Sequence, residues 1–97
     1  MRQRRVSSFE LRQIFNDLGL AELAANGDLQ QWVERDGMAR PQAQQPQGTK
    51  SRVVWYLNQR GQKVALVHEY RLPDGTLGGS GRPDPERVIL DNEIVYC

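Results

Sequence analysis

The sequence predicts an α+β domain in which short N-terminal helices pack on a C-terminal antiparallel sheet of about four strands. Apolar residues recur at three- and four-residue spacing in the first third of the chain and alternate with polar residues in the second half. A glutamine- and proline-rich segment separates the two patterns. We therefore expect one domain over residues 1–97, with a helical part at 1–38, a loop at 39–51 and a β part at 52–97.

The first predicted helix begins at a capping box, in which Ser7 lies three residues before Glu10. Four apolar residues follow at the spacing of one helix face: Leu11, Ile14, Phe15 and Leu18. Gly19 then provides a natural C-terminal stop.

A second short helix is expected over residues 21–25, and a third is expected after Asp28, ending near Gly37. Leu29, Trp32 and Val33 would form the buried side of the third helix. Three short helices joined by tight turns also fit a helix-turn-helix. The basic residues do not line one helix, which favours helices packed against a sheet.

The second half predicts a hairpin of strands at 53–58 and 63–72, joined by a two-residue turn at Arg60-Gly61. That turn fixes the pairs Leu57–Val64, Trp55–Leu66 and Val53–His68 on one face, and Tyr56–Ala65, Val54–Val67 and Arg52–Glu69 on the other. Apolar residues meet one another in this register, and Arg52 meets Glu69 as a cross-strand ion pair.

The last segment predicts one helical turn, with Asp84 as its cap and Pro85 at its first position. Apolar runs at 88–90 and 94–96 flank Asp91-Asn92, which predicts a closing hairpin. The arginines at positions 2, 4 and 5 are interpreted as a basic arm.

Composition excludes several classes of protein. The chain has 13 Lys and Arg and 12 Asp and Glu, a net charge of +1, which argues against both a strongly basic nucleic-acid coat and an acidic nucleic-acid mimic. The single cysteine, Cys97, permits no internal disulfide and suits a reducing compartment. No apolar run approaches the roughly 18 residues of a membrane span, and no apolar segment follows Met1. We expect a cytoplasmic protein without a signal peptide, membrane contact, metal or cofactor.

The segment at residues 75–85 is the strongest pointer to a site, because four of its residues are glycine and two are proline. Its backbone amides and Arg82 can receive a phosphate or carboxylate, although it is neither a P-loop nor a nucleophile elbow. The predicted binding residues are His68, Tyr70, Arg71, Gly78, Gly79, Ser80, Arg82 and Arg87.

Residues 68–87, with the pattern H-E-Y-x-x-x-D-G-T-x-G-G-S-G-x-P-D-P, resemble a segment of small prokaryotic proteins. The resemblance covers about a fifth of the chain and implies no activity.

The favoured function is a non-enzymatic binding or accessory protein, of the kind that mobile elements carry. It would contact a macromolecular partner through the glycine-rich segment and its arginines. We expect a protein partner and favour nucleic acid less; DNA binding through the helical third is the least favoured, and the oligomeric state stays open. The alternative is a metal-independent endoribonuclease of the toxin kind, with His68, Glu69 and Arg82 as its catalytic residues.

Overall fold

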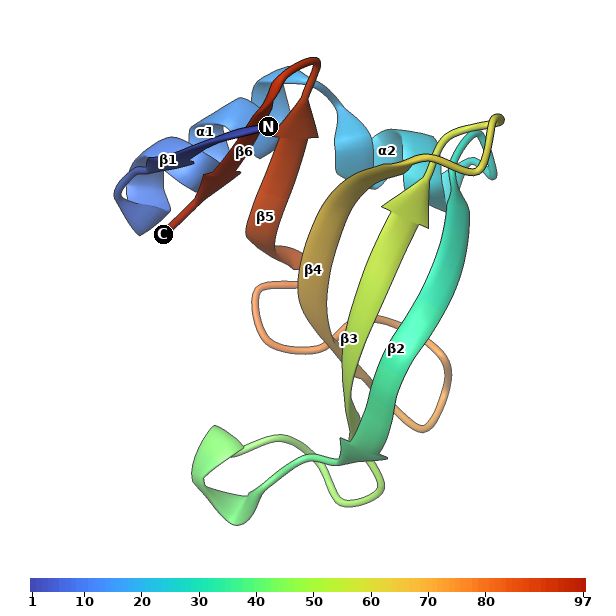
Figure 1. Cartoon of the computed structure of the whole chain (residues 1–97). Coiled ribbons are helices and arrows are strands. Elements are labelled where there is room, and N and C mark those ends of the chain that lie inside the picture. Colours follow the sequence, from blue (N-terminus) through green and yellow to red (C-terminus); the bar gives the residue numbers. More distant parts are fainter.

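The fold is mostly sheet. A computed structural model describes residues 1–97 as one mixed six-stranded sheet with two short helices (Figure 1). The strands are β1 (Arg2–Arg5), β2 (Gln30–Met38), β3 (Lys50–Leu57), β4 (Lys63–Arg71), β5 (Asp84–Leu90) and β6 (Glu93–Tyr96). The helices are α1 (Ser8–Asp17) and α2 (Leu20–Ala25), with a 3₁₀ turn at Pro41–Ala43. The predicted α+β domain of four strands covered by N-terminal helices is therefore wrong.

The strand order is β1-β6-β5-β4-β3-β2, antiparallel throughout except for the parallel pair β1–β6. Both helices lie on one face of the sheet, across one end of the long strands (Figure 1). We call the other side of the sheet the open face. Neither helix has the length and hydrophobicity that a membrane-spanning segment needs.

The predicted start of α1 is confirmed, because the Ser7 hydroxyl accepts a hydrogen bond from the Glu10 N–H at 3.0 Å. Leu11 and Phe15 are buried, as their spacing predicted. Gly19 breaks the helix in the left-handed region, at φ +64°, and α2 follows at once.

The main core lies between the helices and the sheet, where Phe15 contacts Tyr56 with ring centroids 6.2 Å apart. Val54, Val67 and Val88 are among the residues on its sheet side. A smaller cluster lies on the open face and consists of Val53, Trp55 and Leu66. The sheet is therefore apolar on both faces, although helices cover only one.

The β3–β4 hairpin confirms five of the six predicted pairs: Trp55–Leu66, Val53–His68, Tyr56–Ala65, Val54–Val67 and Arg52–Glu69. The sixth pair is wrong. Leu57 faces Lys63 rather than Val64, because the register shifts after Tyr56. The predicted hairpin β5–β6 is also present, closing at Asp91-Asn92.

The predicted third helix is wrong, because residues 30–38 form strand β2. β2 is an edge strand that pairs only with β3, so its side chains are mostly exposed and show no clear alternation. Trp32 was predicted to be buried but is 54 % exposed. Pairing with β3 decides the structure here, overriding the apparent helical spacing.

The predicted helical turn at Asp84-Pro85 is also wrong, because this dipeptide opens strand β5. Pro85 is buried opposite Val67, next to a register shift in the β4–β5 pairing. Proline is tolerated at the first residues of a strand and at bulges, so its missing N–H disrupts no ladder.

The N-terminal arginines form β1 rather than a free arm. The Arg2 N–H donates to the Asn92 carbonyl at 3.0 Å and the Val6 N–H to the Tyr96 carbonyl at 2.8 Å. Arg4 Nε also donates to Glu93 Oε1 at 3.0 Å. Backbone pairing therefore orders a segment with no apolar side chain between positions 2 and 5.

Candidate functional site

A polar pocket of about 440 Å³ opens where β5 separates from β4. The two strands pair only as far as His68 and Asp84. Beyond that point the neighbour of β4 is the Gly-rich loop, residues 72–83, which joins β4 to β5. The Gly78 N–H donates to the Tyr70 carbonyl at 2.9 Å, and Leu77 bridges to Arg71. The loop and α1 form the walls of the pocket.

Six of the eight predicted binding residues line this pocket: His68, Tyr70, Gly78, Gly79, Ser80 and Arg82. Glu69, predicted for the ribonuclease, lines it as well. Arg71 and Arg87 do not line it. Arg12 and Asn16 of α1 do, and no local pattern in the sequence pointed to them, because they lie more than fifty positions from the loop.

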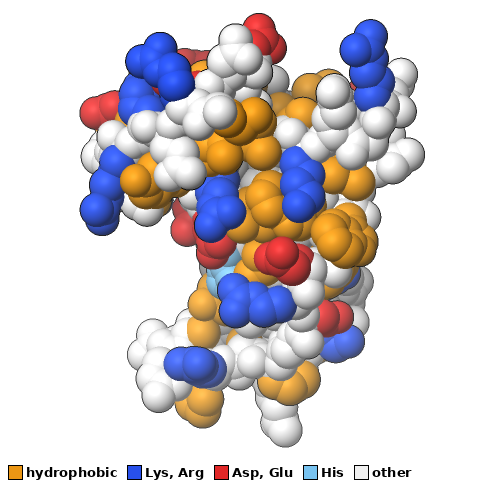
Figure 2. Space-filling model, viewed as in Figure 1, with side chains coloured by type: hydrophobic (Ala, Val, Ile, Leu, Met, Phe, Trp, Pro, Cys, Tyr) orange, Lys and Arg blue, Asp and Glu red, His pale blue; other side chains and the backbone are white.

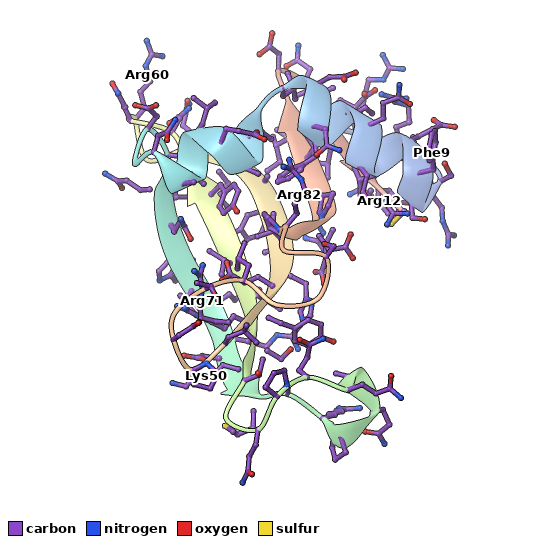
Figure 3. All side chains as sticks on the ribbon, turned by 180° about the vertical axis from the view of Figure 1, so that it is seen from behind. Phe9, Arg12, Lys50, Arg60, Arg71 and Arg82 are labelled. Carbon is purple, nitrogen blue, oxygen red and sulfur yellow. The ribbon has the colours of Figure 1, made fainter.

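Arg82 connects the Gly-rich loop to both helices. Its Nη2 donates to Asn16 Oδ1 and to Glu22 Oε1, each at 3.1 Å. The pKa of Glu22 is lowered, first by hydrogen bonding to its own backbone N–H and then by Arg82. Figure 3 shows Arg82 and Arg12 on the same side of the molecule, close to the helices, with Arg71 farther away beside the loop. Arg82 is therefore a clamp that holds the loop in place.

The N–H groups of Gly79 and Gly81, which could have faced an anion, already have acceptors within the protein. The Gly79 N–H donates to Gln45 Oε1 at 3.2 Å, and the Gly81 N–H to the Gly78 carbonyl at 3.0 Å. A Cβ on Gly78 would lie 2.6 Å from Gln45 Oε1 and 2.9 Å from Leu72 Cδ2, so only glycine fits there without movement. Arg12, which forms no ion pair or hydrogen bond through its side chain, is the available cation of the pocket.

His68 projects on the open-face side of β4. Its Nε2 lies 2.7 Å from the Ser51 hydroxyl, and its ring meets Tyr70 edge to face at a centroid distance of 4.8 Å. Imidazole and hydroxyl thus satisfy each other, and the histidine is only half-buried.

Glu69 projects on the other face and is almost completely buried, at 3 % exposure. Its Oε2 accepts from Arg71 Nε at 2.8 Å and contacts Arg71 Nη2 at 2.6 Å, while Arg71 Nη1 donates to the Gly75 carbonyl at 2.7 Å. Arg71 therefore fastens the loop to β4 as well as neutralising Glu69.

The predicted ion pair between Arg52 and Glu69 is wrong, although the two residues are cross-strand neighbours. Asp36 Oδ2, 4.0 Å from Arg52 Nε, is the carboxylate paired with Arg52. Arg52 Nε is buried without a hydrogen-bond partner. Arg71 wins the contact because it lies two residues along the same strand and reaches the carboxylate with two donors.

No group of three or more His, Cys, Asp or Glu side chains lies close enough together to hold a metal ion. Cys97 is an exposed free thiol.

Comparison of the chain with known protein families, with curated proteins and with solved structures returns no match.

Proposed function

We propose that the protein is a non-enzymatic binding module, and that the pocket between β4, the Gly-rich loop and α1 receives a side chain of a protein partner. The observation that carries this proposal is the Arg82 clamp. It ties the loop to Asn16 and Glu22 and leaves Arg12 unpaired in the wall. A loop already held in shape loses little conformational entropy when a partner binds, which favours affinity.

The available donors indicate which partner chemistry the pocket fits. The unpaired Arg12 guanidinium offers a planar fork of N–H donors, which matches a carboxylate. Tyr70 and Pro83 provide apolar surface beside it. We therefore propose that the partner inserts an aspartate or glutamate side chain.

A binding role agrees with how the two side chains best suited to acid–base chemistry are placed. His68 and Glu69 are neighbours on one strand, so they project to opposite faces. His68 is engaged by Ser51 and Glu69 by Arg71. The two groups therefore do not point at one substrate atom, as an acid–base pair would require.

The test is quantitative affinity capture from native-host extract with immobilised protein. The Arg12→Ala variant is compared with wild type, and Arg60→Ala, a change in the distant β3–β4 turn, is the matched control. A partner lost with Arg12→Ala and retained with Arg60→Ala supports the proposal, provided that its binding also falls with the pocket-filling variant Ser80→Trp. A partner captured equally by all four proteins contradicts it.

The alternative proposal is a metal-independent endoribonuclease, and one observation favours it: His68, Glu69 and Arg82 line the same pocket. Incubation of labelled single-stranded RNA with pure protein in EDTA tests it. Cleavage that His68→Ala and Glu69→Gln abolish would support this alternative, whereas intact RNA, or cleavage that both variants retain, would exclude it.

A further inference from the structure

A second surface lies on the open face, where one row of side chains crosses all six strands. The strand registers place Arg5 beside Tyr96, Tyr96 beside Arg87, and Arg87 beside Leu66. The row continues through Trp55 to Trp32 at the β2 edge. Adjacent strands are about 4.8 Å apart, so the row spans roughly 24 Å.

The tryptophan end of the row is fixed and partly exposed. Trp55 is buried, and its Nε1 donates to Glu34 Oε1 at 3.2 Å. The ammonium of Lys63 lies 4.3 Å from the Trp55 ring centroid and 5.9 Å from that of Trp32. Trp32 is 54 % exposed and is supported from one side by Trp55. It presents aromatic surface to solvent on a rigid sheet.

Four cations share the open face, and none of them forms an ion pair: Arg5, Arg35, Lys63 and Arg87. The cations that do form ion pairs are all on the helix side: Arg4, Lys50, Arg52, Arg71 and Arg82. Figure 2 shows blue cationic side chains interleaved with orange apolar surface on the open face, with red acidic groups near its centre. Two carboxylates lie on this face: Glu34, which accepts from Trp55 Nε1, and Glu86, which lines a pocket with Arg35 and Val53. The cations of the open face are therefore free of ion pairs and can meet an anionic partner, although carboxylates share the face with them.

We propose that the open face binds single-stranded nucleic acid. Unpaired cations favour an anionic backbone, and an exposed indole offers a platform on which an unpaired base stacks. Cation and aromatic ring alternate at one end of the row, through Arg5, Tyr96 and Arg87. At the other end Lys63 lies beside Trp55 and Trp32, so both kinds of group are present along the line. A duplex keeps its bases stacked on one another, so it would use the cations but not Trp32. This site is separate from the pocket proposed for the protein partner, which uses Arg12 on the helix side.

The test is fluorescence anisotropy with a labelled oligo(dT) of about 12 nucleotides, a length within the range of single-strand sites. DNA is used because it lacks the 2′-hydroxyl that ribonuclease chemistry would need. Trp32→Ala should weaken binding about tenfold or more. Lys63→Gln and Arg87→Gln should each reduce the slope of log affinity against log salt by about 0.7.

Two control variants test whether the loss of any exposed aromatic ring or of any surface cation weakens binding. Phe9→Ala removes another exposed aromatic ring, on α1, and Arg60→Gln removes a cation from the β3–β4 turn; both should bind as wild type does. Circular dichroism checks folding, and Arg87→Gln replaces Trp32→Ala as the decisive variant if the latter is unfolded.

Three outcomes would overturn the proposal. The first is no binding of the oligonucleotide by wild-type protein at low salt. The second is an equal loss of affinity in the open-face variants and in Phe9→Ala, or a loss confined to Arg12→Ala, which would move the site to the pocket. The third is equally tight binding of duplex DNA or polyglutamate, which would show that Trp32 reads no unpaired base.

Discussion

Arg71 donates from two nitrogens to a single oxygen of Glu69, and that carboxylate is the only charged side chain of the protein that is buried. The pair also fastens the Gly-rich loop, because Arg71 reaches the Gly75 carbonyl at the same time. A buried charge without its partner is strongly unfavourable.

Arg71→Ala should therefore lower the free energy of unfolding by about 3 kcal/mol, since it leaves the Glu69 carboxylate buried and unpaired. Glu69→Gln should be milder, because a neutral amide replaces the charge. Urea denaturation followed by circular dichroism measures both. The control is Arg4→Ala, which removes a partly exposed pair with Glu93 and should change stability by less than about 1 kcal/mol. Equal effects from Arg71→Ala and Arg4→Ala would contradict this account of the buried pair.

The two phenylalanines on α1 should differ sharply in how much each contributes to the stability of the fold. Phe15 is 1 % exposed and packs on Tyr56, so Phe15→Ala should destabilise the fold by about 3–5 kcal/mol. Phe9 is 70 % exposed, and Phe9→Ala should change stability by no more than about 0.5 kcal/mol. Thermal unfolding of the two variants makes the comparison, and a similar melting temperature for both would show that the helix is not packed as described.

Stability should fall in alkaline solution because of Tyr56. Burial, followed by the negative charge of Glu69, raises the pKa of Tyr56 to about 12 from its usual 10.0. The folded protein then keeps a proton that the unfolded chain loses, so this contribution is full below pH 10 and is lost as the pH rises through about 12. Urea midpoints across this range measure the effect. Tyr56→Phe should remove this contribution, while Tyr70→Phe should keep it.

A side chain at Gly78 should displace the ends of the Gln45 and Leu72 side chains. A methyl group there approaches Gln45 Oε1 and Leu72, so Gly78→Ala should displace Gln45, break its bond to Gly79 and speed proteolytic cleavage of the loop. Gly37→Ala is the matched control, because a Cβ at that position meets nothing within 4 Å. Limited proteolysis with mapped cleavage sites distinguishes the variants, and an unchanged loop in Gly78→Ala would show that the close approach is not limiting.

The parts of the fold that depend on interactions between residues close in sequence could be predicted from the sequence. The Ser7 cap needs only its neighbour Glu10, and the β3–β4 register follows from alternation on both sides of a short turn. β2 could not be predicted in the same way, because its pairing with β3 across the intervening loop decides its structure. Its spacing of Leu29, Trp32 and Val33 imitates a helix face, whereas Trp32 actually lies beside Trp55 in the sheet.

The residues of the candidate site likewise fall into those that the local sequence could predict and those that it could not. The loop and β4 residues of the pocket lie within one segment of the chain and could be found from its glycines. Arg12 and Asn16 reach the pocket only because α1 packs against β5, an arrangement that no local pattern encodes. The row of side chains on the open face likewise depends on the order of all six strands.

The parallel pairing of β1 with β6 bears on how the chain acquires its structure during synthesis. β1 is made before the other strands, but each of its residues pairs with a β6 residue 91 positions later, and α1 packs chiefly on β5. The β2–β3–β4 meander can pair as soon as it is made, because its contacts are close in sequence. Phe15 can already contact Tyr56 of that meander, but the N-terminal strand must wait for its partner until the last hairpin emerges. During that interval the part of α1 that packs on β5 has no partner, so the buried face of this helix is completed only late in synthesis.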